Sequence, residues 1–224
     1  MLHETPTTAA DRAPHPGAAR LAQPVPRLAI RGLASSHAGP VSLELAAGEC
    51  VAIVGESGSG KSVLLRMIAD LDPNQGEVRL DGAARESWPA PAWRARVVYQ
   101  AAEPAWWEPT AAAHLQPDAL AAAQELAAAL RLKPGALDAE LALLSTGERQ
   151  RLALVRSLAR RPQVLLLDEP ASALDAAATL ALETVLDAEL RRGTAILIVT
   201  HSEAQAERLA RRRLRMAAGR LEAA

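Results

Sequence analysis

The sequence predicts an α/β fold with a mostly parallel core sheet, an antiparallel N-terminal β subdomain and a helical insertion. Apolar runs of strand length at 49–54, 163–168 and 194–200 alternate with segments of helical periodicity. That order is typical of a parallel sheet covered by helices on both faces. The strict polar/apolar alternation of 41–45 is typical of a half-exposed antiparallel strand. The stretch 101–144 has no strand pattern and is rich in Ala and Leu, which indicates the insertion.

Composition limits the class of protein. The 224 residues suffice for one large domain, and half of them are apolar, with no Phe and one Tyr, so the core must be aliphatic. A net charge of −1 indicates no general attraction to nucleic acid, and we expect no nucleic-acid partner. The single cysteine, Cys50, cannot form an internal disulfide, which favours a reducing cytoplasm. No apolar run approaches the roughly 20 residues that span a bilayer.

The N-terminal part is expected to contain a disordered leader and then the start of the ordered domain. Residues 1–26 are rich in Pro, Ala and Thr without an apolar period, which predicts disorder. The ordered domain is expected over 27–224, and its first strands at 27–31, 41–45 and 49–54. The third strand leads through a glycine-rich loop into a helix at 62–69.

The remaining elements follow from turn residues and periodicity. Pro91 is expected to open a short helix, and the helical subdomain is expected over about 101–145. Within it we predict a helix at 118–132 and another short helical piece from Pro134. The other expected elements are a turn at 72–76, strands at 77–80, 96–99, 163–168, 194–200, 214–216 and 220–222, and helices at 149–160, 176–192 and 203–210.

The glycine-rich loop fits the pattern G-x-x-x-x-G-K-[ST] between a predicted strand and a predicted helix. Backbone N–H groups and the positive helix end then surround one point, which suits a phosphate chain. Lys61 would add a charge at the phosphates, and the Ser62 hydroxyl would ligate Mg²⁺. A chance match is disfavoured by the flanking elements, so we predict a P-loop NTPase. The residues predicted to bind the nucleotide here are Gly55, Glu56, Ser57, Gly58, Ser59, Gly60, Lys61, Ser62 and Val63.

Two adjacent carboxylates, Asp168 and Glu169, end a predicted buried strand. In P-loop NTPases an acid at this point holds Mg²⁺ beside the P-loop hydroxyl. A second acid can activate the attacking water as a general base. Alone, the pair could be an ordinary acidic turn. Beside a P-loop, we assign Asp168 to the metal and Glu169 to catalysis as the base.

The stretch 145–148 supports two interpretations. Ser145 and Glu148 have the spacing of a capping box at the start of a helix, which is purely structural. A helix N-terminus carrying a serine and a glycine could also face phosphate. Spacing alone leaves both open.

The order of six motifs resembles that of the ATP-binding-cassette (ABC) ATPases over about residues 27–222. By this resemblance Lys61 belongs to Walker A and Asp168 and Glu169 to Walker B. The other motifs are Gln100, 144–150 with the sequence LSTGERQ, 172–175 with SALD, and His201.

The resemblance implies roles for these residues. Gln100 would contact Mg²⁺ and sense the membrane partner, Asp175 would link two active sites, and His201 would contact the γ-phosphate as a catalytic residue. Family members act as head-to-tail dimers, each ATP lying between the P-loop of one chain and the signature of the other. The signature residues implied to bind the nucleotide are Ser145, Thr146, Gly147 and Glu148.

The resemblance also implies a partner. The cofactors would be ATP and Mg²⁺, and hydrolysis would drive a separate integral-membrane permease docked near Gln100, Trp106 and Trp107. The protein would then be cytoplasmic, peripheral on the inner face of the membrane. The compact layout is most similar to small ATPases paired with a metal-export permease. The alternative is a soluble ABC ATPase in DNA repair, translation or regulation, but those usually carry two cassettes or a long coiled-coil insertion.

The chain departs from the family pattern in its signature, upstream of the P-loop, and in its compact loop at 33–41 and compact helical block. Thr146 replaces the first signature glycine and Glu148 the usual Gln. The aromatic that stacks on adenine is missing upstream of the P-loop, and His37 lies in its region.

Overall fold

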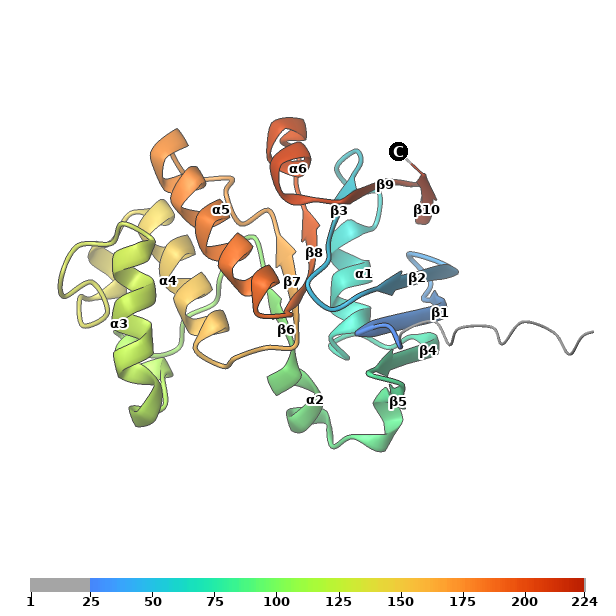
Figure 1. Cartoon of the computed structure of the whole chain (residues 1–224), viewed down its shortest axis with the longest axis horizontal. Coiled ribbons are helices and arrows are strands. Elements are labelled where there is room, and N and C mark those ends of the chain that lie inside the picture. Colours follow the sequence, from blue (N-terminus) through green and yellow to red (C-terminus); the bar gives the residue numbers. More distant parts are fainter. Residues whose placement is uncertain (1–24, 224) are drawn as a thin grey trace, which may run out of the picture.

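The computed structural model describes residues 25–223, in which helices cover both faces of a core sheet and α1 (Lys61–Ile68) separates that sheet from a smaller N-terminal sheet (Figure 1). The expected leader, 1–26, lies outside this part except for its last two residues. The strands are β1 (Leu28–Ala34), β2 (Val41–Leu45), β3 (Cys50–Val54), β4 (Gln75–Leu80), β5 (Ala83–Ala84), β6 (Val97–Gln100), β7 (Val164–Asp168), β8 (Ala195–Val199), β9 (Arg212–Ala217) and β10 (Arg220–Ala223). The helices are α1 (Lys61–Ile68), α2 (Ala90–Arg96), α3 (Leu120–Ala129), α4 (Thr146–Leu158), α5 (Ala176–Arg191) and α6 (Glu203–Leu209).

The N-terminal β subdomain is an antiparallel sheet with the strand order β2-β1-β4-β5. β1 pairs antiparallel with both β2 and β4. Side chains of β2 alternate between buried and exposed, as its sequence predicts. The apolar face of this sheet packs into the core beside α1.

The core sheet has the order β10-β9-β3-β8-β7-β6 and is parallel except for the β9–β10 hairpin. β7 and β8 are buried along their whole length because helices cover both faces. Val164 and Leu166 face the cluster that contains α1, and Leu165 and Leu167 face the cluster formed with α4 and α5. The predicted fold class is confirmed.

The helical insertion differs from the prediction at Pro134, where the chain forms consecutive turns and not a short helix. The amide of Asp138 donates to the carbonyl of Gly135 at 3.0 Å. Gly135 has a φ of +80°, in the left-handed region, so a right-handed helix cannot extend through it. The predicted helix before it forms as α3, which packs against α4 and α5.

The parallel strands place their carboxyl ends at one edge of the core sheet. In open α/β sheets ligands bind outside this edge. The ends of β3, β8, β7 and β6 are neighbours there, and each strand ends in, or is closely followed by, a predicted site residue. Within the described residues, no helix is long and apolar enough to cross a membrane.

Candidate active site

The loop after β3 is shaped by glycines. Gly55, Gly58 and Gly60 all have a positive φ, between +77° and +147°. A Cβ on Gly55 would lie 2.3 Å from the carbonyl oxygen of Met216, so only glycine fits there. Gly60 is the N-cap of α1 and no side chain caps this helix. The loop therefore presents uncapped backbone N–H groups at a helix N-terminus, the arrangement that binds phosphate.

The ammonium of Lys61 lies inside this loop. Its Nζ donates to the carbonyls of Gly55 at 2.8 Å and Glu56 at 2.7 Å, and the side chain is buried. Ser62 and the loop residues Ser57 and Gly58 are exposed. The loop is thus held around a buried positive charge and open to solvent on its outer side.

Gln100 and Asp168 lie at the carboxyl ends of the neighbouring strands β6 and β7 and are each 4% exposed. Within residues 25–223, both polar side-chain atoms of Gln100 lack a hydrogen-bond partner, although an unpaired buried amide costs free energy. One oxygen of Asp168 accepts a hydrogen bond from the hydroxyl of Tyr99 at 3.1 Å. The structure therefore holds an unpaired amide beside a buried carboxylate.

The hydroxyl of Ser62, the amide oxygen of Gln100 and the carboxylate of Asp168 are oxygen ligands that suit a hard cation bound jointly with a phosphate. A hydroxyl, an amide oxygen and a carboxylate are the oxygen ligands that Mg²⁺ takes, and Mg²⁺ is usually held by one or two carboxylates plus phosphates of the substrate. Among the described residues no group of three or more His, Cys, Asp and Glu side chains could hold a metal ion alone. The residues present thus fit a metal bound together with a nucleotide.

Glu169 and His201 contact each other directly. The Nε2 of His201 lies 2.8 Å from Oε1 of Glu169. Glu169 has a φ of +48°, which is uncommon for a residue with a side chain and is found where the surroundings impose it. Both side chains remain partly exposed, so water and substrate can reach them.

The capping box at the start of α4 is present. The amide of Ser145 donates to the Glu148 carboxylate at 2.9 Å, and the amide of Glu148 donates to the Ser145 hydroxyl at 3.3 Å. The Ser145 hydroxyl also donates to that carboxylate at 2.7 Å. These bonds hold the pKa of Glu148 below its usual value, so it is ionised at neutral pH. The interpretation of 145–148 as a capping box therefore holds within one chain. The interpretation that this helix N-terminus faces phosphate stays a prediction.

The signature is exposed and separate from its own P-loop. Ser145 and Thr146 are both exposed. In the described part of the chain no hydrogen bond joins 145–148 to 55–62. Gly147 is required within the chain, because a Cβ there would lie 2.7 Å from the carbonyl oxygen of Ala173. The carboxylate of Asp175 caps α5 by accepting from the amide of Ala178 at 2.7 Å.

The structure adds Gln150, to which the sequence assigned no role of its own. This side chain of α4 is 2% exposed. Its amide nitrogen donates to the Ser172 hydroxyl at 2.9 Å and to the carbonyl of Ala102 at 3.2 Å, and its oxygen accepts from the amide of Ala173. It thereby links the signature helix to the segments after Gln100 and Glu169. It stands between Arg149 and Arg151, so the local sequence contains no signal that this side chain is buried.

The two tryptophans expected near the permease differ in exposure. Trp107 is 71% exposed, whereas Trp106 packs against the core cluster and its ring nitrogen is buried. Both rings contact His114 edge to face, and the guanidinium of Arg156 lies 4.2 Å from the Trp106 ring centre. Trp107, His114 and Arg156 line a cavity of about 790 Å³ beside β6.

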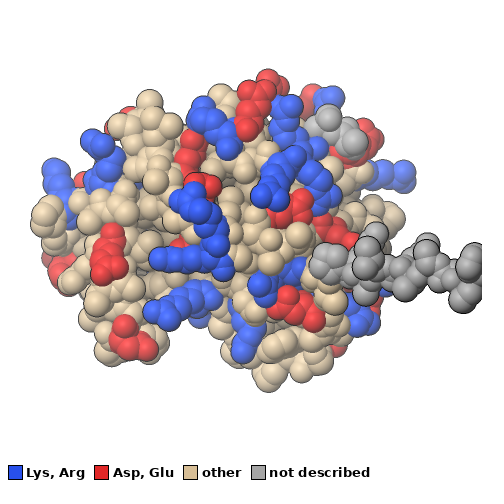
Figure 2. Space-filling view, in the orientation of Figure 1, with Lys and Arg blue, Asp and Glu red and all other residues tan. Residues whose placement is uncertain are grey.

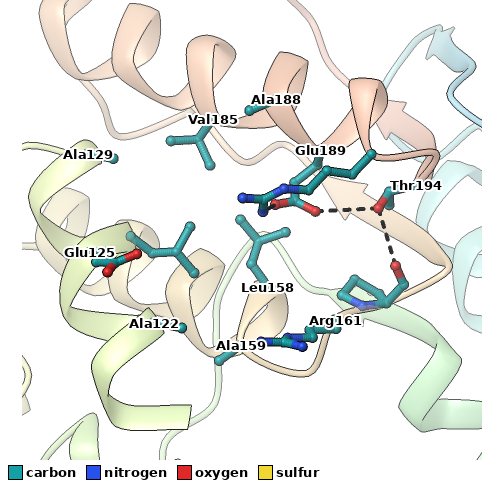
Figure 3. Close-up of a pocket in the computed structure, with 13 residues that line it drawn as sticks. Ala122, Glu125, Ala129, Leu158, Ala159, Arg161, Val185, Ala188, Glu189 and Thr194 are labelled. Carbon is teal, nitrogen blue, oxygen red and sulfur yellow. Dashed lines mark hydrogen bonds and ion pairs between the residues drawn. The ribbon is translucent and has the colours of Figure 1, made fainter.

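A second cavity, of about 630 Å³, lies between α3, α4 and α5 (Figure 3). Its walls are mostly alanine and aliphatic side chains. The hydroxyl of Thr194 donates to Glu189, and Glu189 accepts from Arg192, so these polar groups are already paired. No predicted site residue lines this cavity, and we assign no chemistry to it.

Charged side chains of both signs are interspersed over the face shown in Figure 2. The arginine run of β9 follows the same pattern, because Arg212 pairs with Glu49 and Arg213 with Glu207. Both arginines are exposed to solvent.

Comparison with known proteins identifies relatives. Residues 38–172 match the family model described as "ABC transporter". The chain is 39% identical over 214 residues to the aliphatic sulfonates import ATP-binding protein SsuB of Ralstonia nicotianae, covering 93% of this chain and 72% of that protein. It is 38% identical to the Fe(3+) ions import ATP-binding protein FbpC of Streptomyces coelicolor, covering 81% of this chain and 55% of the relative. Parts of these relatives thus lie outside the match.

Solved structures share the fold. One described as the ATP-binding subunit of an ABC transporter superposes with a TM-score of 0.79 at 25% identity, over 88% of each chain. A dimeric ATP-binding cassette in a post-hydrolysis state with ADP and Pi gives a TM-score of 0.77 at 23% identity, over 87% of this chain and 96% of that one.

Proposed function

The chain belongs to the ABC transporter ATP-binding family, and we propose that two copies bind ATP and Mg²⁺ between them, head to tail, and hydrolyse ATP to drive a separate membrane permease. The observation that carries this proposal is the convergence at one sheet edge. Gln100 and Asp168 are the last residues of two parallel strands, and the P-loop, Glu169 and His201 follow the carboxyl ends of that strand group. Because the relatives are named as import ATP-binding proteins, a transport role is favoured over DNA repair, translation or regulation.

The P-loop and the strand ends would hold the substrate. Backbone amides of the loop and the Lys61 ammonium bind the phosphates, and Lys61 leaves the Gly55 and Glu56 carbonyls to do so. Ser62, Gln100 and Asp168 would hold Mg²⁺, which when bound neutralises charge on the phosphates. The unpaired amide of Gln100 supports this placement.

Glu169 would act as the general base. Its carboxylate orients a water for in-line attack on the γ-phosphate and accepts a proton from it, giving ADP and phosphate. His201 already contacts this carboxylate and would turn toward the γ-phosphate when the nucleotide is present. Lys61 and the signature amides stabilise the developing charge.

The signature would serve the site of the second copy. Ser145 and Thr146 are exposed in one chain and separate from its own P-loop, as a composite site requires. Reciprocal use of the same two surfaces gives a closed twofold dimer. Asp175 lies on the segment that Gln150 ties to the signature helix and would join the two sites.

The base of the nucleotide would lie beside His37. A cavity of about 760 Å³ is lined by His37, by Val63 directly after the P-loop, and by polar side chains including Asn74. An imidazole offers a smaller stacking surface than Tyr or Trp. Binding is therefore expected to depend on the phosphates more than on the base.

The proposal that each site is formed by two chains can be tested by varying the protein concentration. If each site needs two chains, phosphate release per chain rises with protein concentration while the chains are mostly monomeric, and then levels off. The measurement is ATPase activity of the purified chain over a wide dilution series with saturating MgATP. A rate per chain that stays constant while light scattering shows dissociation to monomers would contradict the dimeric site, and absence of hydrolysis at every concentration would contradict the ATPase function.

The cavity beside β6 is the proposed docking surface for the permease. It borders the segment after Gln100 and carries an exposed aromatic ring, Trp107, next to Arg156, and such exposed aromatics mark interaction sites. Through this contact the chain would sit on the inner, cytoplasmic face of the membrane. The relatives named for sulfonate and Fe(3+) import favour an importer over the metal-export pairing expected from the compact layout.

Trp107→Ala is expected to weaken permease binding at least about tenfold, because an exposed interfacial Trp often contributes 2 kcal/mol or more. Basal ATPase activity should stay within twofold of wild type, since the ring contacts no predicted catalytic residue. The measurement is recovery of the permease with the tagged chain from solubilised membranes. Leu143→Ala, which truncates another exposed apolar side chain, is the control. Unchanged recovery with Trp107→Ala would remove this ring from the interface.

A further inference from the structure

Tyr99 is the residue directly before Gln100, and strand register brings it to Asp168. β6 and β7 are parallel, with Tyr99 opposite Leu166. Side chains alternate along a strand, so Asp168, two residues beyond Leu166, lies on the same face as Tyr99. Diagonal neighbours on a sheet face are within reach of an aromatic side chain. The Tyr99 hydroxyl accordingly donates to Oδ2 of Asp168 at 3.1 Å.

The ring of Tyr99 is fixed by its surroundings. It is half-buried and packs against the core cluster that contains α1. The hydroxyl is therefore a donor held at a set position. Phenylalanine would fill nearly the same space and pack equally well, so packing alone does not require the hydroxyl. It is also the only tyrosine of the chain.

The hydrogen bond leaves one oxygen of Asp168 for another partner. Oδ2 accepts from Tyr99, and the carboxylate is 4% exposed, so few positions remain open to it. Groups that hydrogen-bond to a metal ligand fix its orientation and tune its affinity for the metal. We propose that Tyr99 is a positioning residue that orients the Asp168 carboxylate for the divalent cation that accompanies the nucleotide. This inference rests on the proposed function.

The test separates metal affinity from nucleotide affinity. Calorimetric titration of the full chain with ADP is carried out once with Mg²⁺ and once with EDTA. In wild type we expect tighter binding with Mg²⁺. In Tyr99→Phe the ADP affinity in EDTA should stay within twofold of wild type. The ratio of ADP affinity with Mg²⁺ to that in EDTA should fall by roughly tenfold, the smaller effect expected when a group that hydrogen-bonds to a metal ligand is lost.

Turnover supplies a second readout. In Tyr99→Phe the Mg²⁺ concentration for half-maximal ATPase activity should rise by a similar factor, and excess Mg²⁺ should restore kcat to within about twofold. The control is Thr184→Val, which removes a hydroxyl that donates to the carbonyl of Leu180 on the exposed side of α5. It should change neither quantity.

Each outcome decides the question. If Tyr99→Phe keeps the wild-type gain from Mg²⁺, or loses affinity equally with Mg²⁺ and with EDTA, the positioning role is wrong. If excess Mg²⁺ leaves kcat depressed, the hydroxyl acts on another step and the inference is likewise overturned. If wild-type affinity does not depend on Mg²⁺ at all, the proposed metal-dependent function itself fails.

Discussion

Glu169→Gln is expected to reduce steady-state ATP hydrolysis at least about 100-fold, the contribution of a positioned general base. Glutamine keeps the shape of the side chain and an oxygen that can still accept a hydrogen bond from His201, but it cannot accept the proton of the attacking water. Binding and closure of the dimer need no such proton transfer. The variant should therefore accumulate an ATP-bound dimer, seen as an earlier peak in size-exclusion chromatography with MgATP and not with MgADP.

Glu125→Gln on the exposed side of α3 is the matched control, because it makes the same chemical change far from the sheet edge. It should keep wild-type turnover and form no stable dimer. Hydrolysis by Glu169→Gln at the wild-type rate would show that another group serves as the base. Loss of hydrolysis without a trapped dimer would place Glu169 in nucleotide binding instead.

Lys61→Met is expected to weaken ATP binding roughly 30- to 150-fold, which corresponds to the loss of about 2–3 kcal/mol from a charged hydrogen bond. Methionine has similar length and fits a buried site, but it cannot donate to phosphate or to the loop carbonyls. The measurement is the affinity for MgATP by titration calorimetry, with thermal unfolding as a check on the fold.

The chain offers a matched control, because its only other lysine is Lys133, which is exposed on the turn after α3. Lys133→Met should bind MgATP as wild type does. Equal losses in the two variants would point to net charge and not to the P-loop ammonium. Wild-type affinity in Lys61→Met would exclude this side chain from the phosphate site.

Local signals predicted most of the fold. The buried β7 and β8 are continuous apolar runs, and β2 alternates strictly, so period and composition fix both their type and their exposure. The boundaries of α1 and α5 follow from Gly60 and Asp175, which have the residue types expected before a helix. The short helix predicted from Pro134 was wrong, because the adjacent Gly135 takes a positive φ that helix propensity does not reveal.

The candidate site could be predicted only as a set of motifs. The P-loop pattern and the acids after β7 carry their chemistry in consecutive residues, so the sequence places them without a structure. The different exposure of Trp106 and Trp107 could not be predicted, because it depends on the packing of Trp106 against core residues that lie far away in the sequence. Gln150 was missed for the same reason, since its partners lie 19 to 48 residues away.

The sequence by itself determined that this chain folds around a P-loop, and it predicted which side chains bind phosphate, hold a cation and activate water, because these signals reside in short segments. Only the tertiary structure decided how the segments meet. Parallel pairing of β6 with β7 brings the Tyr99 hydroxyl to Asp168, and pairing of β7 with β8 brings His201 to Glu169. These contacts depend on strand order and register, which join residues far apart in the chain and leave no local pattern in the sequence.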